Sequence, residues 1–556
     1  MTAPDPHMRW WGWGVDGHDA PLSPGALALL AERIGPLPSD RREPVALEDV
    51  RLPDPALPAV ARERLVAAVG AEHVRDDRLA RVSHAAGRGY HDLVRLRAGQ
   101  LAGAPDAVVY PGDAAEVAAV LRACAEEGVA VVPFGGGTSV VGGVEPLRGR
   151  FPAVVALDLA RLDRLLSTDS VSLTATVQAG MTGPALEAAL GERGLTLGHF
   201  PQSFEHATVG GWVATRSAGQ ASTGYGRIDE LVLALRVLTP SGEIATRVVP
   251  ASAAGPRLRE LLVGSEGALG VIVEVTLRVR PTPAVRRYEA FSLPRLRDGV
   301  DAFRTLVQSG CAPDVARLSD PLETQVSLEL SGGERLATRA LRGYLRARGH
   351  GEGCLVIAGW EDASEAAVRR RRSATVRVLH EHGALALGTP VGRAWEHGRF
   401  HAPYLRDELL AHGVMVETLE TATTWERLLE LHDAVAAALD GALRGRGTPP
   451  IVMSHVSHVY RAGASLYFTF VARQEDGAEL EQWHAAKAAA SEAILAGGGT
   501  ITHHHAVGRD HAPWLPGEVG ELGIALLRAA KATLDPAGVM NPCKLIDPAP
   551  LPGAGF

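Results

Sequence analysis

Three consecutive glycines that directly follow a predicted strand are the feature that most constrains this chain. Residues 107–110 form an apolar strand, residues 114–127 a helix and residues 129–134 a second strand, and this order is a βαβ signature. The glycines at 135–137 come next. Because glycine has no Cβ atom, the backbone N–H groups of such a loop can converge on a diphosphate. The segment therefore predicts an α/β domain with a phosphate-binding loop, and a tight turn without a ligand is the plain alternative.

The spacing of the loop narrows the kind of phosphate site. The letters PFGGGTS at 133–139 match neither GxxxxGK[ST] nor GxGxxG, so a P-loop and a Rossmann fingerprint are excluded at this point. Thr138 and Ser139 add hydroxyl donors beside the glycines. The loop must therefore hold its phosphate in another way.

Length and composition set the class of protein. At 556 residues and 58.5 kDa the chain exceeds the roughly 250–300 residues at which single cores stop growing, so two or more domains are expected. Apolar residues at 46% and charged residues at 22% are typical of a folded globular protein. The net charge of -8, with no basic tail, gives no reason to expect nucleic-acid binding.

Cysteine usage and hydropathy predict a location. The four cysteines lie far apart and form no CxxC pair, which argues against a disulfide framework or a zinc cluster and fits a reducing cytoplasm. They are Cys124, Cys311, Cys354 and Cys543. The chain starts without a cleavable signal pattern, and no apolar run approaches the roughly 18 residues of a membrane span. We expect a cytoplasmic protein, and peripheral contact with a bilayer through an amphipathic patch stays open.

Local patterns divide the chain into four parts. Short helical patterns and a Pro-rich link come first, then the α/β pattern, then Arg-rich amphipathic helices that alternate with strands, and finally a C-terminal segment. The expected parts are residues 1–102, 103–283, 284–500 and 501–556. No fixed-period repeat indicates a solenoid or propeller. The four arginines at 369–372 point in different directions on a helix, which favours a solvated surface over an anion site.

Three glycine-rich segments occur in an order that is typical of one flavin-binding fold. PFGGGTSVVGG at 133–143, PQSFEHATVGG at 201–211 and GSEGALGVI at 264–272 resemble loops of the FAD-binding domain shared by the vanillyl-alcohol oxidase and p-cresol methylhydroxylase flavoproteins. TRSAG at 215–219 resembles the helix start beside the second loop. Each segment alone could be a glycine-rich turn. Three of them in this order, over about 140 residues, favour the resemblance.

The resemblance implies an α+β flavoprotein. It would have a two-part FAD-binding domain, an α+β substrate or cap domain, a helical N-terminal lead-in, and a C-terminal segment, DPAGVMNPCK at 535–544, that returns to the flavin domain. The residues expected to hold FAD are Pro133, Phe134, Gly135, Gly136, Gly137, Thr138, Ser139, Pro201, Ser203, Glu205, Ala207, Thr208, Gly210, Gly211, Thr215, Arg216, Ser217, Ala218, Glu266, Gly267, Ala268, Leu269, Gly270, Val271 and Ile272. Relatives that attach FAD covalently generally carry a histidine in or near the first loop. This chain has Thr138 there, and Cys124 lies upstream on a predicted helix, so a non-covalent FAD is implied.

Within this superfamily the chain is most similar to the alkyldihydroxyacetonephosphate synthases, also called alkylglycerone-phosphate synthases, almost from end to end. RWWGWG at 9–14 resembles the opening motif, for which only aromatic packing is expected. ARLSD at 316–320 and YLRD at 404–407 resemble segments in which the family places essential arginines. Arg317 and Arg406 are therefore expected to bind the substrate phosphate through paired N–H donors. Without the resemblance, each would be assigned to the surface or to helix pairing.

Two tyrosines stand where related D-2-hydroxyacid dehydrogenases carry the histidines of an HxGDGNxH-type motif, which binds metal and substrate. They are Tyr460 and Tyr467. Phenol is a poor ligand for a divalent ion at neutral pH, so no metal is expected. In the synthase family a tyrosine matching Tyr467 takes part in proton transfer, whereas the pattern alone indicates a half-buried strand aromatic. Because the pKa of free tyrosine is about 10, neighbouring positive charge is expected to favour the phenolate.

Three consecutive histidines, His503, His504 and His505, follow a glycine-rich approach. On an extended strand His503 and His505 would share one face and His504 the other, so the three would not converge on one metal ion. From the residues alone, the triplet could be a metal site, a surface cluster or a mimic of a purification tag. It also resembles the active-site triplet of the synthase family, which implies proton handling by groups with an ordinary pKa of about 6.5.

The resemblance implies exchange of the acyl chain of acyl-dihydroxyacetone phosphate for a long-chain alcohol, giving an ether-lipid precursor and a fatty acid without net redox change. The flavin would act as an electrophile, Tyr467 would remove the C1 proton, the two arginines would hold the phosphate, and the histidines would manage protons at the exchanging oxygens. The expected partners are a lipid-like phosphorylated substrate and a fatty alcohol, and a homodimer is expected. An FAD-dependent oxidase or dehydrogenase of an alcohol or 2-hydroxy acid is the alternative, and a flavin-binding protein without turnover is a second.

Overall fold

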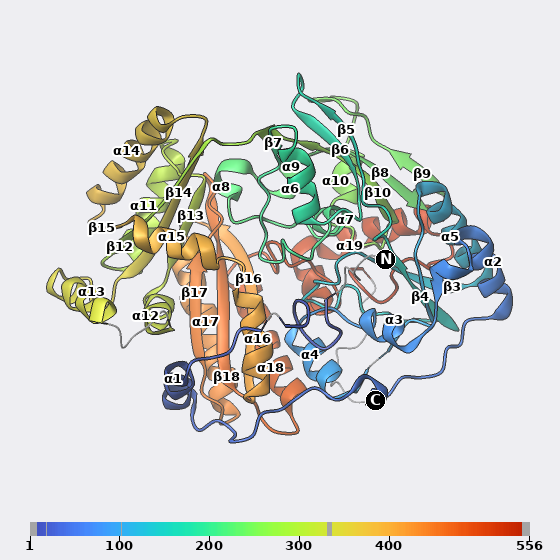
Figure 1. Ribbon diagram of the computed structural model, residues 1–556, viewed down its shortest axis with the longest axis horizontal. Coiled ribbons are helices and arrows are strands. Elements are labelled where there is room, and N and C mark those ends of the chain that lie inside the picture. Colours follow the sequence, from blue (N-terminus) through green and yellow to red (C-terminus); the bar gives the residue numbers. More distant parts are fainter. Residues whose placement is uncertain (1–7, 18, 102, 331–335, 547–556) are drawn as a thin grey trace.

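Two lobes lie side by side in the computed structural model, which describes residues 8–17, 19–101, 103–330 and 336–546 (Figure 1). One lobe contains a four-stranded and a five-stranded sheet, and the other contains a seven-stranded sheet. The α+β architecture predicted from the sequence is confirmed. Among the described helices, none has both the length and the hydropathy of a membrane span.

The four-stranded sheet carries the first glycine loop. Strands β2, β4 and β3 are parallel, and β1 pairs antiparallel with β2 at the edge. Helix α5 connects β2 to β3; the side chain of Asp113 caps its first turn and Gly128, with φ 66°, ends it. The buried Val and Ala residues of β3 and β4 suit parallel strands that are covered on both faces. The bounds are β1 Val74–Arg75, β2 Ala107–Val109, α5 Ala114–Glu127, β3 Val129–Phe134 and β4 Ala153–Asp158.

The five-stranded sheet is antiparallel throughout, and the third loop leads into its strand β10. It shares one apolar core with the four-stranded sheet. Its strands, in spatial order, are β5 Leu165–Asp169, β6 Thr174–Gln178, β10 Val271–Arg278, β8 Val232–Thr239 and β9 Gly242–Ala245, and the pair β7 Leu195–Thr196 and β11 Arg280–Pro281 lies beside it. The helices of this part are α6 Gly183–Gly191, α7 Val209–Ala214, α8 Ser222–Tyr225, α9 Ile228–Leu231 and α10 Leu258–Leu262.

The seven-stranded sheet is also antiparallel, and it forms the second lobe. Its spatial order is β15 Leu385–Gly388, β12 Val285–Leu293, β14 Cys354–Asp362, β13 Val315–Ser319, β17 Ile451–Val456, β18 Gly463–Arg473 and β16 Val414–Thr424. Helices of this lobe are α11 Leu296–Gln308, α12 Pro321–Leu330, α13 Leu336–Ala347, α14 Glu365–Glu381, α15 Thr389–Gly398, α16 Ala402–Ala411, α17 Leu428–Gly445 and α18 Glu479–Ala496.

Residue alternation along β18 decides which side chains face the helices. Leu466, Phe468 and Phe470 are buried in the apolar core that also contains residues of α17 and α18. Because successive side chains of a strand point to opposite faces, Tyr467 and Thr469 lie on the other face of the sheet. The aromatic strand pattern thus separates a packing face from a face available for chemistry.

The predicted helical lead-in is present but is divided between the lobes. Helix α1 packs against the seven-stranded lobe, α2 packs on α5 of the other lobe, and α4 lies against β16 and α18. The bounds are α1 Pro24–Ile34, α2 Ala59–Val69, α3 Arg78–Ser83 and α4 Tyr90–Arg97. This region is therefore part of both lobes and makes no core of its own.

The arginine run on α14 differs from the sequence-based expectation of a solvated surface. Arg369 and Arg370 are exposed, but Arg371 donates to Asp314 at 2.7 Å and Arg372 donates to Glu289 at 2.8 Å. Both carboxylates are buried. Half of the run thus attaches α14 to the sheet, because the helix places these two side chains over acidic groups whose charge needs compensation.

The C-terminal segment returns to the first lobe. Helix α19 Leu515–Leu534 is kinked at Gly520, and beyond it Met540 forms a parallel bridge with Val131 of β3. The side-chain amide of Asn541 donates to the carbonyl oxygen of Glu266 at 2.6 Å. The tail thus adds backbone and side-chain hydrogen bonds to the strand and the loop that border the predicted flavin site.

The aromatic N-terminal motif packs as expected. Trp13 is buried, lies edge-on to the His206 ring at 5.8 Å, and donates its backbone N–H to Asp407 at 2.7 Å. Arg9 lies over the Trp11 ring at 4.3 Å and also donates to Asp407. The motif thereby packs against α16, the helix that carries Arg406.

Candidate functional site

A cavity opens between the glycine loop after β3, the second loop before α7, and the start of β10. Many of the predicted cofactor residues line it: Pro133, Phe134, Gly135, Ser139, Thr208, Gly210, Gly211, Thr215, Glu266, Gly267, Gly270, Val271 and Ile272. Gly143, Val144, Leu159, Ala214 and Ala506 complete the lining. The sequence segments that resemble flavin loops are thus brought together around one space.

The other predicted cofactor residues lie in the same loops without lining the cavity. They are Gly136, Gly137, Thr138, Pro201, Ser203, Glu205, Ala207, Arg216, Ser217, Ala218, Ala268 and Leu269. Some of them serve neighbouring structure: Arg216 donates to the carbonyl oxygen of Glu260 at 2.7 Å, and the Glu205 carboxylate accepts from the Tyr404 hydroxyl at 2.9 Å. Their contribution to FAD binding stays a prediction.

The glycines of the first loop are required by its contact with the second loop. A Cβ atom on Gly135 would lie 2.3 Å from Thr208 Oγ1, and one on Gly136 would lie 1.9 Å from the carbonyl oxygen of His206. Both distances are below any tolerable non-bonded contact. Side chains at these positions would separate the two loops, so the glycine run makes possible a close approach of two backbones at the cavity.

Glu266 joins the cavity to the C-terminal segment. Its carboxylate accepts the backbone N–H groups of Val507 and Gly508 at 2.8 and 2.6 Å, and Ala506, next to them, lines the cavity. Burial raises the pKa of Glu266 to about 7. The histidine triplet, which directly precedes Ala506, is therefore held at the rim of the predicted flavin site.

Four polar side chains form a row on the face of the seven-stranded sheet opposite to α17 and α18. Glu420 of β16 is the strand partner of Tyr467 on β18, and Tyr467 is the partner of His455 on β17. On β13 the strand partner of His455 is Ser319. Arg317 lies two residues before Ser319 on the same strand, so its side chain is on the same face of the sheet. The ring of His455 stacks on Tyr467 at 4.8 Å. The strand pairing alone thus places a guanidinium, an imidazole, a phenol and a carboxylate in sequence.

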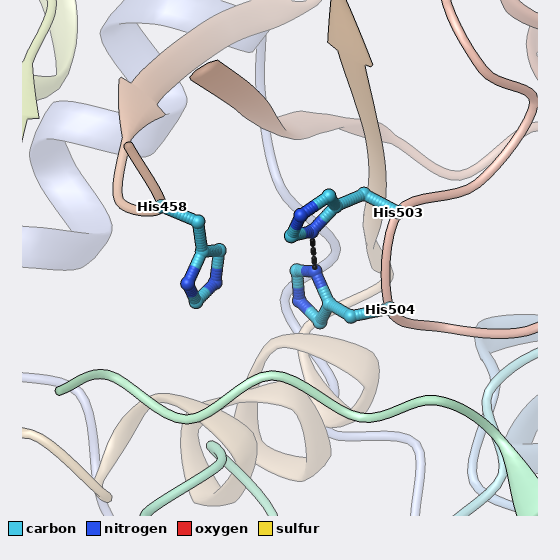
Figure 2. Close-up of side chains that lie close together, drawn as sticks. All are labelled: His458, His503 and His504. Carbon is cyan, nitrogen blue, oxygen red and sulfur yellow. Dashed lines mark hydrogen bonds between the residues drawn. The ribbon is translucent and has the colours of Figure 1, made fainter. Parts of the chain in front are cut away.

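The histidine triplet is not extended, which corrects the expectation that His504 would face away from its neighbours. The chain bends at His503 to His505 and wraps around the carboxylate of Glu420. That carboxylate accepts the backbone N–H groups of all three histidines and the hydroxyl of Thr502. As a result, Nδ1 of His503 lies 2.9 Å from Nδ1 of His504, as the dashed line in Figure 2 shows.

Burial governs the charge of this histidine loop. It lowers the pKa of His503 well below its ordinary value, lowers the pKa of His504, and lowers the pKa of His505 to about 3. Burial opposes ionisation of Glu420 as well, but the surrounding histidines and backbone N–H groups outweigh it and hold the pKa of Glu420 well below its ordinary value. At neutral pH the loop therefore presents neutral imidazoles around one carboxylate.

Tyr467 differs from the expectation of a stabilised phenolate. Arg406 does act on it as a nearby positive charge, but burial is the larger effect and raises the pKa of Tyr467. The phenol lies beside the rings of His504 at 5.9 Å and His505 at 5.5 Å. Tyr467 is thus a neutral phenol at rest, and its ring lies beside two neutral imidazole rings.

The two predicted phosphate-binding arginines already have protein partners. Arg317 donates to Glu323 at 2.9 Å and contacts both ring nitrogens of His455 at 3.1 Å. Arg406 donates to the carbonyl oxygen of Arg88 at 2.7 Å and lies 3.4 Å from Glu417. Arg317 is connected to Tyr467 through the stacked ring of His455, and Arg406 acts on Tyr467 as a nearby positive charge. Their role toward a phosphate stays a prediction.

Several residues at the site were missed by the sequence reasoning. Glu420 and His455 are buried polar residues within apolar strands. Burying a polar side chain costs free energy, so such residues are often functional. This pattern could have identified them from the sequence. His458 follows β17 and lies beside the triplet, with its ring 5.1 Å from that of His503. Arg227, near the start of α9, lowers the pKa of these histidines further through its positive charge. No sequence signal connects Arg227 with the triplet.

Comparisons with known proteins agree with this geometry. The family model "FAD binding domain" matches residues 105–247, and "FAD linked oxidases, C-terminal domain" matches residues 282–545. The alkyldihydroxyacetonephosphate synthase of Dictyostelium discoideum is 33% identical over 94% of this chain and 86% of its own. That of Trypanosoma brucei brucei is 34% identical over 90% and 82%. A solved structure of an alkyldihydroxyacetonephosphate synthase is 29% identical and superimposes with a TM-score of 0.84, covering 97% of this chain and 99% of its own.

The chain belongs to the alkyldihydroxyacetonephosphate synthase family. FAD is the cofactor of this family fold, and the cavity suits it: the two loops approach through glycines that tolerate no Cβ, and backbone N–H groups of a glycine loop are the donors that a diphosphate needs. The sequence-based assignment to the synthase family and to an FAD-dependent enzyme is confirmed.

We expect Gly136→Ala to prevent stable FAD binding in this synthase-family member, because the new methyl group would collide with the carbonyl oxygen of His206 and push the two loops apart. The measurement is the flavin-to-protein absorbance ratio of the purified variant. Gly191→Ala, where a Cβ meets nothing within 4 Å, is the matched control and should keep full occupancy. Full occupancy in Gly136→Ala would show that the two loops do not need this contact.

The stability of the protein should fall below pH 6.5 through buried histidines such as His511. Burial lowers the pKa of His511 to about 3, so the unfolded chain takes up its proton near pH 6.5 and the folded protein does not until about pH 3. Between pH 6.5 and 5.5 this residue should therefore cost about 1 kcal/mol of stability. Urea unfolding at both pH values should show a smaller loss for His511→Gln than for the wild type. The same substitution at the exposed His397 should leave the loss unchanged, and equal losses in all three proteins would contradict the assignment.

Proposed function

We propose that this chain is an FAD-dependent alkylglycerone-phosphate synthase. It exchanges the acyl chain of acyl-dihydroxyacetone phosphate for a long-chain alcohol, forming the ether-lipid precursor and releasing a fatty acid. The observation that carries the proposal is the row of polar groups around Tyr467, which continues through the histidine triplet to Ala506 at the flavin cavity. The family membership gives the reaction its chemical identity.

The phosphate of the substrate would bind near Arg317 and Arg406, which lie on the two sides of Tyr467. Arg406 is the better placed of the two, because its partners are a backbone carbonyl and a carboxylate at 3.4 Å, whereas the Glu323 carboxylate engages Arg317 closely. A guanidinium fork bound to phosphate donates two parallel hydrogen bonds. This binding would fix C1 of the headgroup relative to the phenol of Tyr467.

Proton transfer falls to Tyr467 and the histidines together. Because burial raises the pKa of Tyr467, the phenol can remove the C1 proton only while it passes its own proton to a neighbouring base. The rings of His504 and His505 lie beside it and are the proposed acceptors, and because burial lowers their pKa values they would hold that proton only transiently. The histidines then deliver a proton to the departing carboxylate or take one from the entering alcohol. FAD, when bound, would supply the electron-poor ring that allows the substituent on the headgroup carbon to be exchanged without net redox change.

The direct test is to incubate the FAD-loaded protein with acyl-dihydroxyacetone phosphate and labelled hexadecanol. Labelled ether product supports the proposal, and its absence while a simple 2-hydroxy acid bleaches the flavin would move the chain to the dehydrogenase alternative. No product and no bleaching with either substrate would favour a flavin-binding protein without turnover.

The FAD should be bound without a covalent link. One histidine beside the first loop is His84, whose ring packs on Phe134 at 4.3 Å. Both of its ring nitrogens are engaged, by the carbonyl oxygen of Ala80 at 2.7 Å and by Asp158 at 2.8 Å. Burial raises the pKa of the Cys124 thiol to about 12, so it is a poor nucleophile. Acid precipitation should therefore release the yellow colour into solution, and flavin that stays with the pellet would contradict this.

We expect Arg406→Lys to weaken binding of the phosphorylated substrate by tenfold or more while FAD occupancy is unchanged, because lysine keeps the charge but loses the planar fork. The measurement is the apparent affinity for acyl-dihydroxyacetone phosphate together with the flavin absorbance ratio. Arg370→Lys, on the exposed face of α14, is the control and should match the wild type. Wild-type affinity in Arg406→Lys would remove Arg406 from the phosphate site.

A homodimer and peripheral contact with a lipid surface are further parts of the proposal. Helix α19 offers one surface in their support: Val519, Leu522 and Leu526 lie three to four residues apart and are exposed. A second copy or a bilayer would cover such a stripe. Sedimentation of the protein alone and with phospholipid vesicles tests the two contacts separately.

A further inference from the structure

Three histidines from two separate segments point their ring nitrogens into one space. His458 comes from the turn after β17, and His503 and His504 come from the bent triplet (Figure 2). One ring nitrogen of each lies within 4.8 Å of the others. His458 and His503 are buried and His504 is half-buried. The expectation that the three histidines would not converge on one metal ion assumed an extended strand, and the bend around Glu420 removes that assumption.

In His458 and His503, the ring nitrogen that faces away from the shared space, here called the outer nitrogen, already has a hydrogen-bonding partner of the kind found around metal-bound histidines. Nδ1 of His458 lies 2.6 Å from the hydroxyl of Ser222, and Nε2 of His503 lies 2.6 Å from the hydroxyl of Tyr460. When these outer nitrogens carry the proton and donate it, the inner nitrogens are left with free lone pairs. Such outer hydrogen bonds fix the tautomer and the ring orientation of metal-binding histidines.

The inner nitrogens are close to the spacing that one ion needs. Bonds of about 2.1 Å to a tetrahedral zinc ion place two nitrogen ligands roughly 3.4 Å apart. His503 and His504 already approach within 2.9 Å through their Nδ1 atoms. The ligand nitrogen of His458 lies within 4.8 Å of the other two, so its ring must turn toward them for one ion to bind all three. Three histidines with an open fourth position form a well-known type of zinc-binding set.

The charges and the chemistry of the cluster favour a transition-metal ion over a hard cation. All three ligands are neutral imidazoles, which suit zinc, cobalt and copper more than magnesium or calcium. The carboxylate of Glu420 lies 3.6 Å from Nδ1 of His504 and supplies negative charge next to the site, which offsets the nearby Arg227. Glu420 itself is a poor ligand, because four N–H and O–H donors already occupy its oxygens.

We propose that His458, His503 and His504 bind one divalent transition-metal ion of the zinc class, and that this ion inhibits the enzyme. The binding stands on the geometry alone. The inhibition rests on the proposed function, because a metal bond occupies the same lone pairs of His503 and His504 that would accept protons during the exchange.

Binding is measured on the FAD-loaded protein after treatment with EDTA. Co²⁺ should bind with one equivalent and give the visible absorption bands of a four-coordinate cobalt site, and Zn²⁺ should displace it. Ser222→Ala should weaken Co²⁺ binding by about 10–100-fold, the usual effect of losing an outer hydrogen bond. His458→Gln, which removes a ligand, should weaken it more. His350→Gln is the control, since His350 is a buried histidine bonded to Ser292 on another part of the sheet, and it should bind Co²⁺ like the wild type.

Absence of the cobalt bands in the wild-type protein would overturn the site, and so would unchanged Co²⁺ binding in both His458→Gln and Ser222→Ala. Ether synthesis is assayed in parallel, in EDTA and with added Zn²⁺. Zn²⁺ that binds without slowing the reaction would overturn the inhibition. Lack of ether synthesis in EDTA, with cobalt binding intact, would count against the proposed function and leave the metal site standing.

Discussion

The carboxylate of Glu420 is the group on which the arrangement of the site depends. It is buried on β16, and it accepts three consecutive backbone N–H groups and a hydroxyl from the segment Thr502 to His505. Few other anchors could hold three neighbouring side chains in a tight bend inside a protein, because each buried N–H left without an acceptor costs about 1–3 kcal/mol. The strand pairing of Glu420 with Tyr467 then sets the distance between the triplet and the phenol. One acidic residue thus places both proton-transfer groups.

A second buried carboxylate connects this chemistry to the flavin cavity. Glu266 lines the cavity and accepts the N–H groups of Val507 and Gly508, two to three residues after the triplet. Glu420 belongs to the seven-stranded lobe and Glu266 to the other lobe, so the segment from Thr502 to Gly508 is fixed to both. Movement of one lobe relative to the other would displace the histidines from either Tyr467 or the cavity. The position of the site between two lobes therefore follows from two carboxylates that bind one short segment.

The sequence predicted the parts of this site that local patterns control. The glycine run after β3 could be recognised as a possible phosphate loop because a missing Cβ lets backbone N–H groups converge, although a tight turn was the alternative. Tyr467 could be placed on a strand by its neighbours Leu466 and Phe468. The bend of the triplet could not be predicted, since it depends on Glu420, about eighty residues away in the chain. The same holds for the pKa of Tyr467, which the sequence suggested would be lowered by a positive charge. Arg406 provides that charge, but the extent of burial is a property of the folded lobes, and burial outweighs it.

The central claim of this account is that Tyr467 and its neighbouring histidines move a proton to and from the substrate. It is tested most directly by the exchange of the C1 hydrogen of acyl-dihydroxyacetone phosphate with solvent in Tyr467→Phe, a variant that removes one oxygen atom and should keep its fold and its FAD. The account predicts that exchange and ether synthesis fall together by roughly 10²–10⁴-fold, the usual loss when a general acid or base is removed. The same substitution at Tyr344, an exposed residue of α13, should leave both at the wild-type level. Exchange at a near-normal rate in Tyr467→Phe would contradict the account and return Tyr467 to a packing role on β18.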